Sequence, residues 1–265
     1  MKQIAVSPGP DGPHRRALVT GASEGLGRVF TKKLAHAGYH CVAVARNEAR
    51  LRELVDELPA GNHEWMVADL GTTDGVAQCA TRLSEEHFDL LVNNAGFSRF
   101  GLFHESTAAE QEQMLDVDCR AVLLLAHAFL TSARPGDALI NLSSITNFLP
   151  TPIQPTYCAA KAFIASLSES LWYQQRSRGV YVQGLCPGVT LTRFVERAGE
   201  VRIKSILDAL SQSPEAVVDA SLHALARRRR PIVVPGLHNR LVVLATKLLP
   251  RRALVLASGH LGDLA

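Results

Sequence analysis

The sequence lacks the cysteine patterns that mark disulfide-rich and zinc-binding proteins. Its 265 residues include five cysteines, an odd number, with no CxxC or Cys/His ligand spacing. These are Cys41, Cys79, Cys119, Cys158 and Cys186. We therefore expect reduced thiols in or near the core and no metal site.

The sequence also has no apolar stretch typical of a signal peptide or a membrane-spanning helix. Met1–Arg16 is rich in Gly, Pro and His, so we expect residues 1–15 to form a flexible leader and the protein to be cytoplasmic. The apolar stretch Leu237–Leu256 is interrupted by charges and a proline, well short of a span of about 20 residues. For this tail, residues 236–265, three interpretations stay open: packing on the domain or a subunit interface, weak contact with a membrane surface, or a substrate lid.

An excess of charge of one sign is missing as well. The chain has 28 Lys and Arg against 25 Asp and Glu, and its basic residues are spread along the sequence. This distribution argues against nucleic acid as a partner. The local exception is Arg227–Arg230, which we interpret as a solvated helix end.

Apolar runs and helical segments alternate along most of the chain. Hydrophobic residues make up 47% of the sequence, enough for a large core. The alternation is typical of a parallel sheet with helices on both faces. The predicted strands are Ala17–Thr20, Cys41–Ala45, Glu64–Ala68, Leu90–Val92, Ala138–Leu142, Val180–Leu185 and Ile232–Val234. With no linker or repeat between them, they predict a single α/β domain over residues 16–235, built on a doubly wound parallel sheet.

A glycine-rich segment joins the first strand to the first helix. Gly21, Gly25 and Gly27 give the spacing GxxxGxG, which is neither GxGxxG nor a Walker A loop. Glycines allow positive φ and a close approach of the backbone to a pyrophosphate, whose charge the helix N-terminus stabilises. Taken alone, the segment is also compatible with a simple glycine-rich turn.

Two further strand ends carry residues suited to a dinucleotide. Asp69 follows the third strand and can accept a hydrogen bond from an adenine amine. Asn93–Gly96 closes the fourth strand, where a small Ala-Gly pair leaves room for a ligand to cross the sheet edge. Because parallel sheets bind ligands at the carboxyl ends of their strands, these residues predict one site with the glycine-rich segment.

Five motifs in one order resemble the short-chain dehydrogenase/reductase family. They are TGxxxGxG at Thr20–Gly27, the strand-end Asp69, NNAG at Asn93–Gly96, a serine ahead of YxxxK, and Pro187-Gly188. The resemblance implies a Rossmann-type sheet, a nicotinamide cofactor and an oligomer built from the helices that carry Asp118 and Tyr157. We expect a homodimer, because the C-terminus lacks the Gly-Gly-type ending that often accompanies tetrameric relatives.

The end of the second strand favours NADP(H) over NAD(H). An acidic residue there would bond the ribose 2′-hydroxyl, but Ala45 occupies the place and Arg46 offers a guanidinium to a 2′-phosphate. Arg46 pointing into water is the alternative. Glu24 in the glycine-rich segment counts against NADP(H), since a carboxylate near a 2′-phosphate is unfavourable.

Tyr157 and Lys161 are the expected acid/base pair. They stand four residues apart in YxxxK and so share one face of a helix. A free phenol has a pKa of about 10, so a tyrosine working near neutrality benefits from the positive charge of Lys161. By the resemblance, Lys161 also bonds the nicotinamide ribose, and Ser144 holds the substrate oxygen and stabilises a developing alkoxide. Ser143 is the alternative to Ser144.

Asp118 departs from the family pattern, which has an Asn at this position. By the resemblance, that Asn props open a helix and helps to hold a water chain from the lysine to solvent. An ionised aspartate accepts hydrogen bonds but cannot donate one. We expect the relay to survive with an altered pH dependence, and we keep Asp118 among the catalytic residues.

The remaining cofactor and substrate contacts follow from the resemblance. Residues 191–213 are expected to cover the substrate as a lid. The expected cofactor residues are Gly21, Ser23, Gly25, Leu26, Gly27, Arg46, Asn47, Asp69, Leu70, Asn94, Ala95, Gly96, Tyr157, Lys161, Pro187, Gly188, Val189, Thr190 and Thr192. The apolar residues expected near the substrate are Phe97, Phe100, Phe103, Phe148 and Phe194.

Together these patterns predict an NADP(H)-dependent oxidoreductase that interconverts a ketone and a secondary alcohol. The apolar surroundings favour a fatty-acyl, steroid-like or secondary-metabolite ketone as the small-molecule substrate. The alternatives are an NADP(H)-binding sensor or scaffold with weak or no catalysis, an NAD-dependent alcohol dehydrogenase, and a membrane-surface enzyme acting on lipid-like carbonyls.

Overall fold

The computed structural model describes residues 15–190, 194, 198 and 211–263, and within them the chain forms one parallel sheet. Its seven strands follow the order β3-β2-β1-β4-β5-β6-β7. They are β1 (Arg16–Thr20), β2 (His40–Ala45), β3 (Glu64–Val67), β4 (Leu90–Asn93), β5 (Ala138–Leu142), β6 (Tyr181–Leu185) and β7 (Ile232–Val233). The predicted Rossmann-type sheet is confirmed, and each predicted strand agrees with the structure to within one residue at either end.

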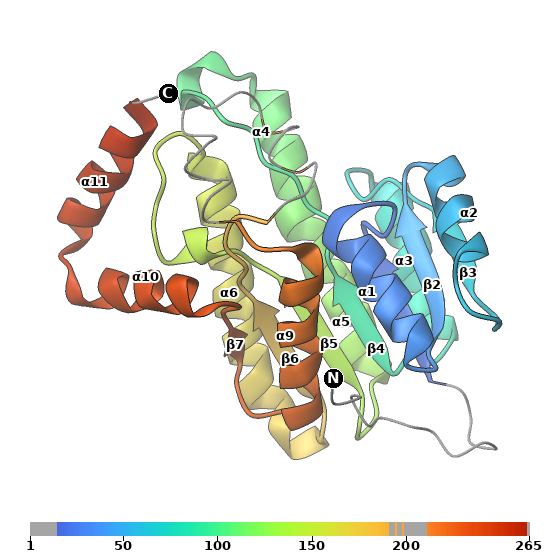
Figure 1. The fold of residues 1–265 in the computed structure, drawn as a ribbon. Coiled ribbons are helices and arrows are strands. Elements are labelled where there is room, and N and C mark those ends of the chain that lie inside the picture. Colours follow the sequence, from blue (N-terminus) through green and yellow to red (C-terminus); the bar gives the residue numbers. More distant parts are fainter. Residues whose placement is uncertain (1–14, 191–193, 195–197, 199–210, 264–265) are drawn as a thin grey trace.

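Helices cover both faces of this sheet (Figure 1). One layer holds α1 (Gly25–His36), α2 (Glu48–Asp56) and α9 (Pro214–Arg227), and the other holds α3 (Thr73–Glu85), α5 (Val122–Ser132) and α6 (Pro155–Gln175). Strand side chains alternate between them: Ala17 and Val19 pack in the first layer, and Leu18 packs in the second. This two-sided burial explains why the strands read as continuous apolar runs.

The other elements lie around the two ends of the sheet and beyond its β7 edge. They are η1 (Phe103–Glu105), α4 (Ala108–Leu115), the π-helical turn η2 (Asp116–Ala121), η3 (Ile145–Asn147), η4 (Arg176–Arg178), α10 (Leu237–Leu248) and α11 (Arg251–Asp263). In Figure 1, α10 and α11 extend from the β7 side as an arm. No helix among the described residues is long and apolar enough to cross a bilayer.

The winding reverses between β1 and β4, which are adjacent in the sheet and extend it in opposite directions. Such a switch point opens a crevice outside the carboxyl ends of the strands, where folds of this kind bind ligands. The predicted site residues follow these strand ends, so the fold gathers them at one edge.

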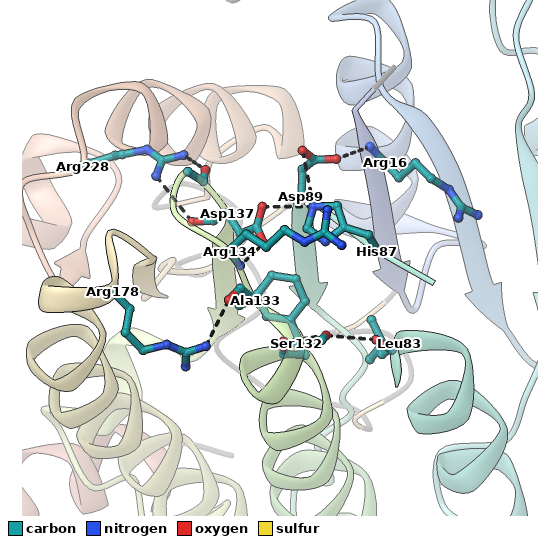
Figure 2. A network of polar contacts seen from close by, with 12 residues as sticks. Arg16, Leu83, His87, Asp89, Ser132, Ala133, Arg134, Asp137, Arg178 and Arg228 are labelled. Atoms are coloured by element: carbon teal, nitrogen blue, oxygen red, sulfur yellow. Dashed lines mark hydrogen bonds and ion pairs between the residues drawn. The ribbon is translucent and has the colours of Figure 1, made fainter. Parts of the chain in front are cut away.

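A polar network ties together the opposite edge, at the amino ends of the strands (Figure 2). Asp89 accepts a hydrogen bond from the backbone N–H of Arg16 at 2.7 Å, and Asp137 accepts one from Arg134 at 2.6 Å. His87 Nε2 lies between the carboxylates, 3.4 Å from Asp137 and 3.9 Å from Asp89. This network anchors β1, β4 and β5 at the edge farthest from the candidate site.

Arg228, in the basic run Arg227–Arg230 that we expected to be solvated, is exposed but makes specific hydrogen bonds. It ends α9 with a left-handed backbone (φ 49°) and donates hydrogen bonds to the carbonyl oxygens of Gly136 and Asp137. A left-handed conformation costs a non-glycine residue about 1–2 kcal/mol, so these bonds offset a local strain.

We therefore predict a specific order of stability for two replacements of Arg228. Arg228→Ala should lower the free energy of unfolding by about 1–2 kcal/mol, since it removes the bonds and keeps the strain. Arg228→Gly removes both and should be about 1 kcal/mol more stable than the alanine variant. Urea unfolding of the two variants measures the difference. A glycine variant no more stable than the alanine variant would contradict the account.

Candidate active site

The turn between β1 and α1 forms a cradle of bare backbone. Gly21 and Gly25 have positive φ, 65° and 53°. At Gly27, a Cβ would lie only 2.3 Å from the carbonyl oxygen of Gly21, so no side chain fits there. The N-cap residue of α1, Glu24, makes no side-chain hydrogen bond to the helix. The cradle thus has the shape and the helix N-terminus that a pyrophosphate needs.

The ends of β1 and β4 are fastened to each other beside this cradle. Thr20 Oγ1 accepts hydrogen bonds from the backbone N–H groups of Asn94 and Ala95, at 2.9 and 3.0 Å. The Asn94 side chain returns a bond of 2.8 Å to the Thr20 carbonyl. Asn94 therefore acts as a clamp between the strands, and Gly96 follows it directly. Thr20 begins the TGxxxGxG motif, and its place at the strand end before a glycine was a usable signal for this contact.

At the end of β2, the structure adds Arg50, which the sequence patterns did not identify as a site residue. Arg46 is exposed, and Asn47 caps α2 by accepting from the backbone N–H of Arg50 at 3.0 Å. Arg50 Nη1 also lies 2.8 Å from Glu24 Oε2. The carboxylate that weighed against a 2′-phosphate is therefore paired with a cation. Arg50 could have been identified from its spacing in the sequence, since it stands one helical turn after Arg46.

The ends of β3 and β6 contribute less specific contacts. Asp69 is half-buried and uses Oδ1 to accept from the backbone N–H of Gly71 at 3.0 Å, and Leu70 is buried beside it. After β6, the Pro187 carbonyl accepts from Ile145 at 2.9 Å, which joins this turn to the segment that follows Ser144.

The same turn is held from the other side by the C-terminal part of the chain. The backbone N–H of Gln212 donates to the Val189 carbonyl at 2.9 Å, and Thr190 Oγ1 donates to the Gly188 carbonyl at 3.1 Å. Thr192 and most of the predicted lid lie outside the described residues.

Tyr157 and Lys161 share one face of α6, as predicted, and both are buried. Lys161 Nζ lies 5.3 Å from the centroid of the Tyr157 ring, and the Phe194 ring lies 5.6 Å from it on a tilted plane. Burial raises the pKa of Tyr157 to about 12, Lys161 acts to lower it, and Asp118 acts to raise it further. The phenol is thus shielded from solvent and lies close to the Lys161 ammonium group.

The two serines after β5 have different partners. Ser143 donates its hydroxyl hydrogen to the Lys161 carbonyl at 2.7 Å, which ties β5 to α6. Ser144 is the N-cap of η3, where it accepts from the Thr146 N–H at 3.2 Å, and its hydroxyl acts to lower the pKa of Tyr157. Of the two, only Ser144 is placed beside the phenol.

Asp118 meets Lys161 directly inside the protein. Its Oδ1 lies 2.6 Å from Lys161 Nζ, its Oδ2 accepts from the Phe97 N–H at 3.0 Å, and neither side chain is more than 4% exposed. Lys161 also donates to the Leu142 carbonyl at 3.1 Å. Burial acts to lower the pKa of Lys161, but Asp118 and Tyr157 act together to raise it, and the pKa is raised overall.

The π-helical turn η2 carries Asp118 between α4 and α5. The wider turn inserts an extra residue into the helix, a distortion that is frequent at functional sites. Gly96 leaves the space that the pair needs, because a Cβ there would lie 2.6 Å from Asp118 Oδ1 and 3.1 Å from Lys161 Nζ.

A cavity of about 220 Å³ opens beside Tyr157. Its apolar lining includes Phe100, Leu102, Phe103 and Met114. Two of the five predicted phenylalanines therefore line it, and Phe194 reaches the tyrosine ring separately. Neither Phe97 nor Phe148 belongs to this lining. The rest of the lining is polar and includes Arg99, Glu105, Gln111 and Gln154. The phenol in the cavity wall and the serine hydroxyl beside it suit a carbonyl or alcohol group.

The sequence profile of the short chain dehydrogenase family matches residues 15–202. The chain belongs to this family. The oxidoreductase YxnA of Bacillus subtilis is 32% identical over 246 residues, which cover 88% of this chain and 68% of YxnA. The dehydrogenase is therefore an oxidoreductase of a family that binds nicotinamide cofactors and acts on small molecules.

Two solved structures are similar to this dehydrogenase over nearly their whole length. One is a short-chain dehydrogenase from Sphingobium yanoikuyae in complex with NADPH, 31% identical, with a TM-score of 0.77. The other is the bulky-bulky ketone specific alcohol dehydrogenase from Comamonas testosteroni, 28% identical, with a TM-score of 0.73. Each match covers 88% of this chain and 93% of the other.

Proposed function

We propose that this dehydrogenase is an NADP(H)-dependent ketoreductase that interconverts an apolar ketone and its secondary alcohol. The observation that carries the proposal is the arrangement of Ser144, Tyr157 and Lys161 at the carboxyl edge of the sheet, with Tyr157 in the wall of a cavity that has both polar and apolar sides.

The residues around the crevice fit a nicotinamide dinucleotide. The cradle at Gly21, Gly25 and Gly27 would hold its pyrophosphate, Asp69 its adenine, and the turn at Pro187–Thr190 its nicotinamide. Leu26, Leu70 and Ala95 would line the path between them. The bound cofactor would supply hydride in reduction and accept it in oxidation.

Tyr157 is the group that moves the proton. In reduction it donates its phenolic hydrogen to the carbonyl oxygen, and in oxidation the phenolate takes that proton back. Ser144 donates a hydrogen bond to the same oxygen and stabilises the charge that develops there. Lys161 favours the phenolate by its charge, and it is positioned by Asp118 and the Leu142 carbonyl.

Asp118→Asn should move the pH profile of alcohol oxidation toward lower pH. Asp118 adds to the raised pKa of Tyr157, so removing its charge lowers that pKa. The phenolate then forms at lower pH, and the rate near neutrality should rise several-fold. Measuring kcat for oxidation against pH tests this, with Asp116→Asn, two residues earlier, as the matched control. An unchanged profile, or a shift to higher pH, would show that Asp118 does not tune the phenol.

Arg46 is the residue that we expect to select NADP(H). It is exposed at the end of β2, where a 2′-phosphate would lie, and Arg50 neutralises the nearby Glu24. The NADPH complex of the Sphingobium yanoikuyae relative supports this choice of cofactor.

Arg46→Ala should raise the Kd for NADPH about tenfold or more and leave the Kd for NADH unchanged. Glu24→Gln should tighten NADPH binding, because it releases Arg50 toward the phosphate. Titrations that follow cofactor fluorescence measure the Kd values for NADPH and NADH in the wild type and in both variants. An equal loss of affinity for NADPH and NADH in Arg46→Ala would mean that Arg46 does not bind the 2′-phosphate. That result would favour an NAD-dependent alcohol dehydrogenase.

We further propose a cytoplasmic homodimer. Free thiols at all five cysteines agree with a reducing compartment. Exposed apolar side chains lie on the helices expected to pair: Leu115, Leu123, Leu124 and Phe163. Analytical ultracentrifugation should show a dimer that Leu123→Ser/Leu124→Ser dissociates.

The test of the proposed function is a panel of ketones of increasing apolar bulk, offered with NADPH. We expect NADPH oxidation with bulky apolar ketones and little with small polar ones. Support comes from the apolar part of the cavity lining, which includes Phe100 and Phe103, and from the bulky-bulky ketone specificity of the Comamonas testosteroni relative. Tight NADPH binding without turnover of any ketone would favour a sensor or scaffold.

A further inference from the structure

Helix α10 carries an apolar stripe that does not face the protein. Leu237, Leu241, Leu244 and Leu248 follow the spacing i, i+4, i+7, i+11, which puts them on one side of a helix. They are 53 to 76% exposed. A surface helix of a globular protein normally turns such a stripe toward the core, so this orientation is the reverse of the usual one.

The opposite side of α10 fixes this orientation. Asn239 and Val243 are buried, and the Asn239 side chain donates to the Pro235 carbonyl and to Gln212 Oε1, both at 2.9 Å. Helix α11 is anchored by buried Leu254 and by Ser258, whose hydroxyl donates to the Pro150 carbonyl at 2.7 Å. The arm is thus held by specific contacts with its leucines outward, and Leu249, Val255 and Leu256 extend the exposed apolar surface.

The charges of this part of the chain are all of one sign. No acidic residue occurs between Asp219 and Asp263. The basic residues of the same stretch are Arg227, Arg228, Arg229, Arg230, Arg240, Lys247, Arg251 and Arg252. Arg240 and Lys247 flank the stripe of α10, and Arg251 and Arg252 begin α11.

From these observations we infer that the arm formed by α10 and α11 docks on an anionic lipid bilayer surface. Leucines beside cations are what an interfacial helix needs, because the apolar side chains enter the acyl boundary while the cations meet anionic headgroups. A second copy of the chain fits less well. A symmetric contact of this arm with itself would bring the same cations together with no carboxylate from the segment to oppose them.

The arm also adjoins the candidate substrate cavity. The residue that anchors Ser258, Pro150, lies on the segment between Ser144 and α6, and this segment leads to Gln154 and Tyr157 in the cavity wall. Docking would therefore place the cavity close to the bilayer, where apolar ketones collect. This consequence rests on the proposed function, whereas docking itself does not.

Flotation with lipid vesicles tests the docking without any turnover. The full chain is mixed with vesicles of phosphatidylcholine alone, or with vesicles that also contain phosphatidylglycerol. Leu241→Ser/Leu244→Ser removes half of the stripe without disturbing a buried contact. Val67→Ser/Tyr173→Ser is the matched control, since it removes two exposed apolar side chains far from the arm in sequence.

We expect the wild type and the control to bind the anionic vesicles, and the leucine variant to bind about tenfold or more weakly. Binding should also fall with added salt. Two results would overturn the inference: a wild type that floats with neither vesicle, or a leucine variant that binds as well as the wild type. If the leucine variant instead lost only self-association, the arm would be an interface between copies. None of these results depends on whether a ketone is reduced.

Discussion

Tyr157→Phe is expected to lower kcat for ketone reduction about 1000-fold while leaving the Kd for NADPH within about twofold of the wild-type value. The substitution removes one hydroxyl and keeps the ring, so the contacts with Phe194 and with the Lys161 ammonium persist. Without the hydroxyl, the ring has no proton to give to the carbonyl oxygen. Stopped turnover with intact cofactor binding would thus separate proton transfer from folding.

The matched control for this prediction is Tyr181→Phe. Tyr181 is also buried, but its hydroxyl donates to the Arg230 carbonyl at 2.7 Å, at the opposite edge of the sheet. The control should lose some stability and keep its kcat. A Tyr157→Phe variant with more than about a tenth of wild-type kcat would contradict the assignment, because general acid/base groups contribute at least about 100-fold.

The second large effect is expected on stability, at the pair formed by Lys161 and Asp118. Lys161→Met should lower the free energy of unfolding by about 3–5 kcal/mol, because it leaves the Asp118 carboxylate buried without a cation. The double variant Lys161→Met/Asp118→Asn should recover most of this loss, since a neutral pair has no unpaired charge. Neither variant should regain wild-type activity, because both lack the ammonium.

The pH dependence of the Lys161→Met defect gives a second measurement. Burial raises the pKa of Asp118. Lys161→Met removes the ammonium group that acts to lower this pKa. A carboxyl with a raised pKa in the folded state stabilises the fold at low pH and loses that contribution as pH rises. The defect should therefore shrink in acid and grow toward neutrality, whereas the double variant should show little such trend. Urea unfolding at several pH values would contradict the account if the two variants were equally stable throughout.

The fold could be predicted from the sequence because its signals are local. Each strand is buried on both faces, so it reads as a short apolar run, and the helices between the runs are amphipathic. The glycine-rich segment and YxxxK were readable for a similar reason, since spacing alone places Gly21 near Gly27 and Tyr157 near Lys161. These signals need no knowledge of distant contacts.

Other features of the site could not be read in this way because they depend on contacts between distant segments. Glu24 and Arg50 stand 26 positions apart, and only the packing of α1 against the start of α2 pairs them. Ser143 and Ser144 are adjacent and chemically alike, but strand alternation turns one toward the Lys161 carbonyl and the other toward Tyr157. The π-helical turn that brings Asp118 to Lys161 has no sequence signal that separates it from an ordinary helix.

The tail shows the same limit. Its composition left packing on the domain or a subunit interface, membrane contact and a lid open, because hydrophobic residues alone do not show which way they face. The structure supplies the direction through Asn239, Val243 and Ser258, which hold the arm from its inner side.

In the proposed reaction, hydride passes between NADPH and a carbonyl carbon at the site of Tyr157. The most direct test is reduction of the best ketone of the panel with NADPH deuterated at C4 of the nicotinamide, followed by mass spectrometry and NMR of the product. We predict one deuterium on the carbinol carbon, delivered from one face of the nicotinamide, and none with Tyr157→Phe in the same time. NADPH oxidation that leaves the alcohol carbon free of deuterium would contradict the account.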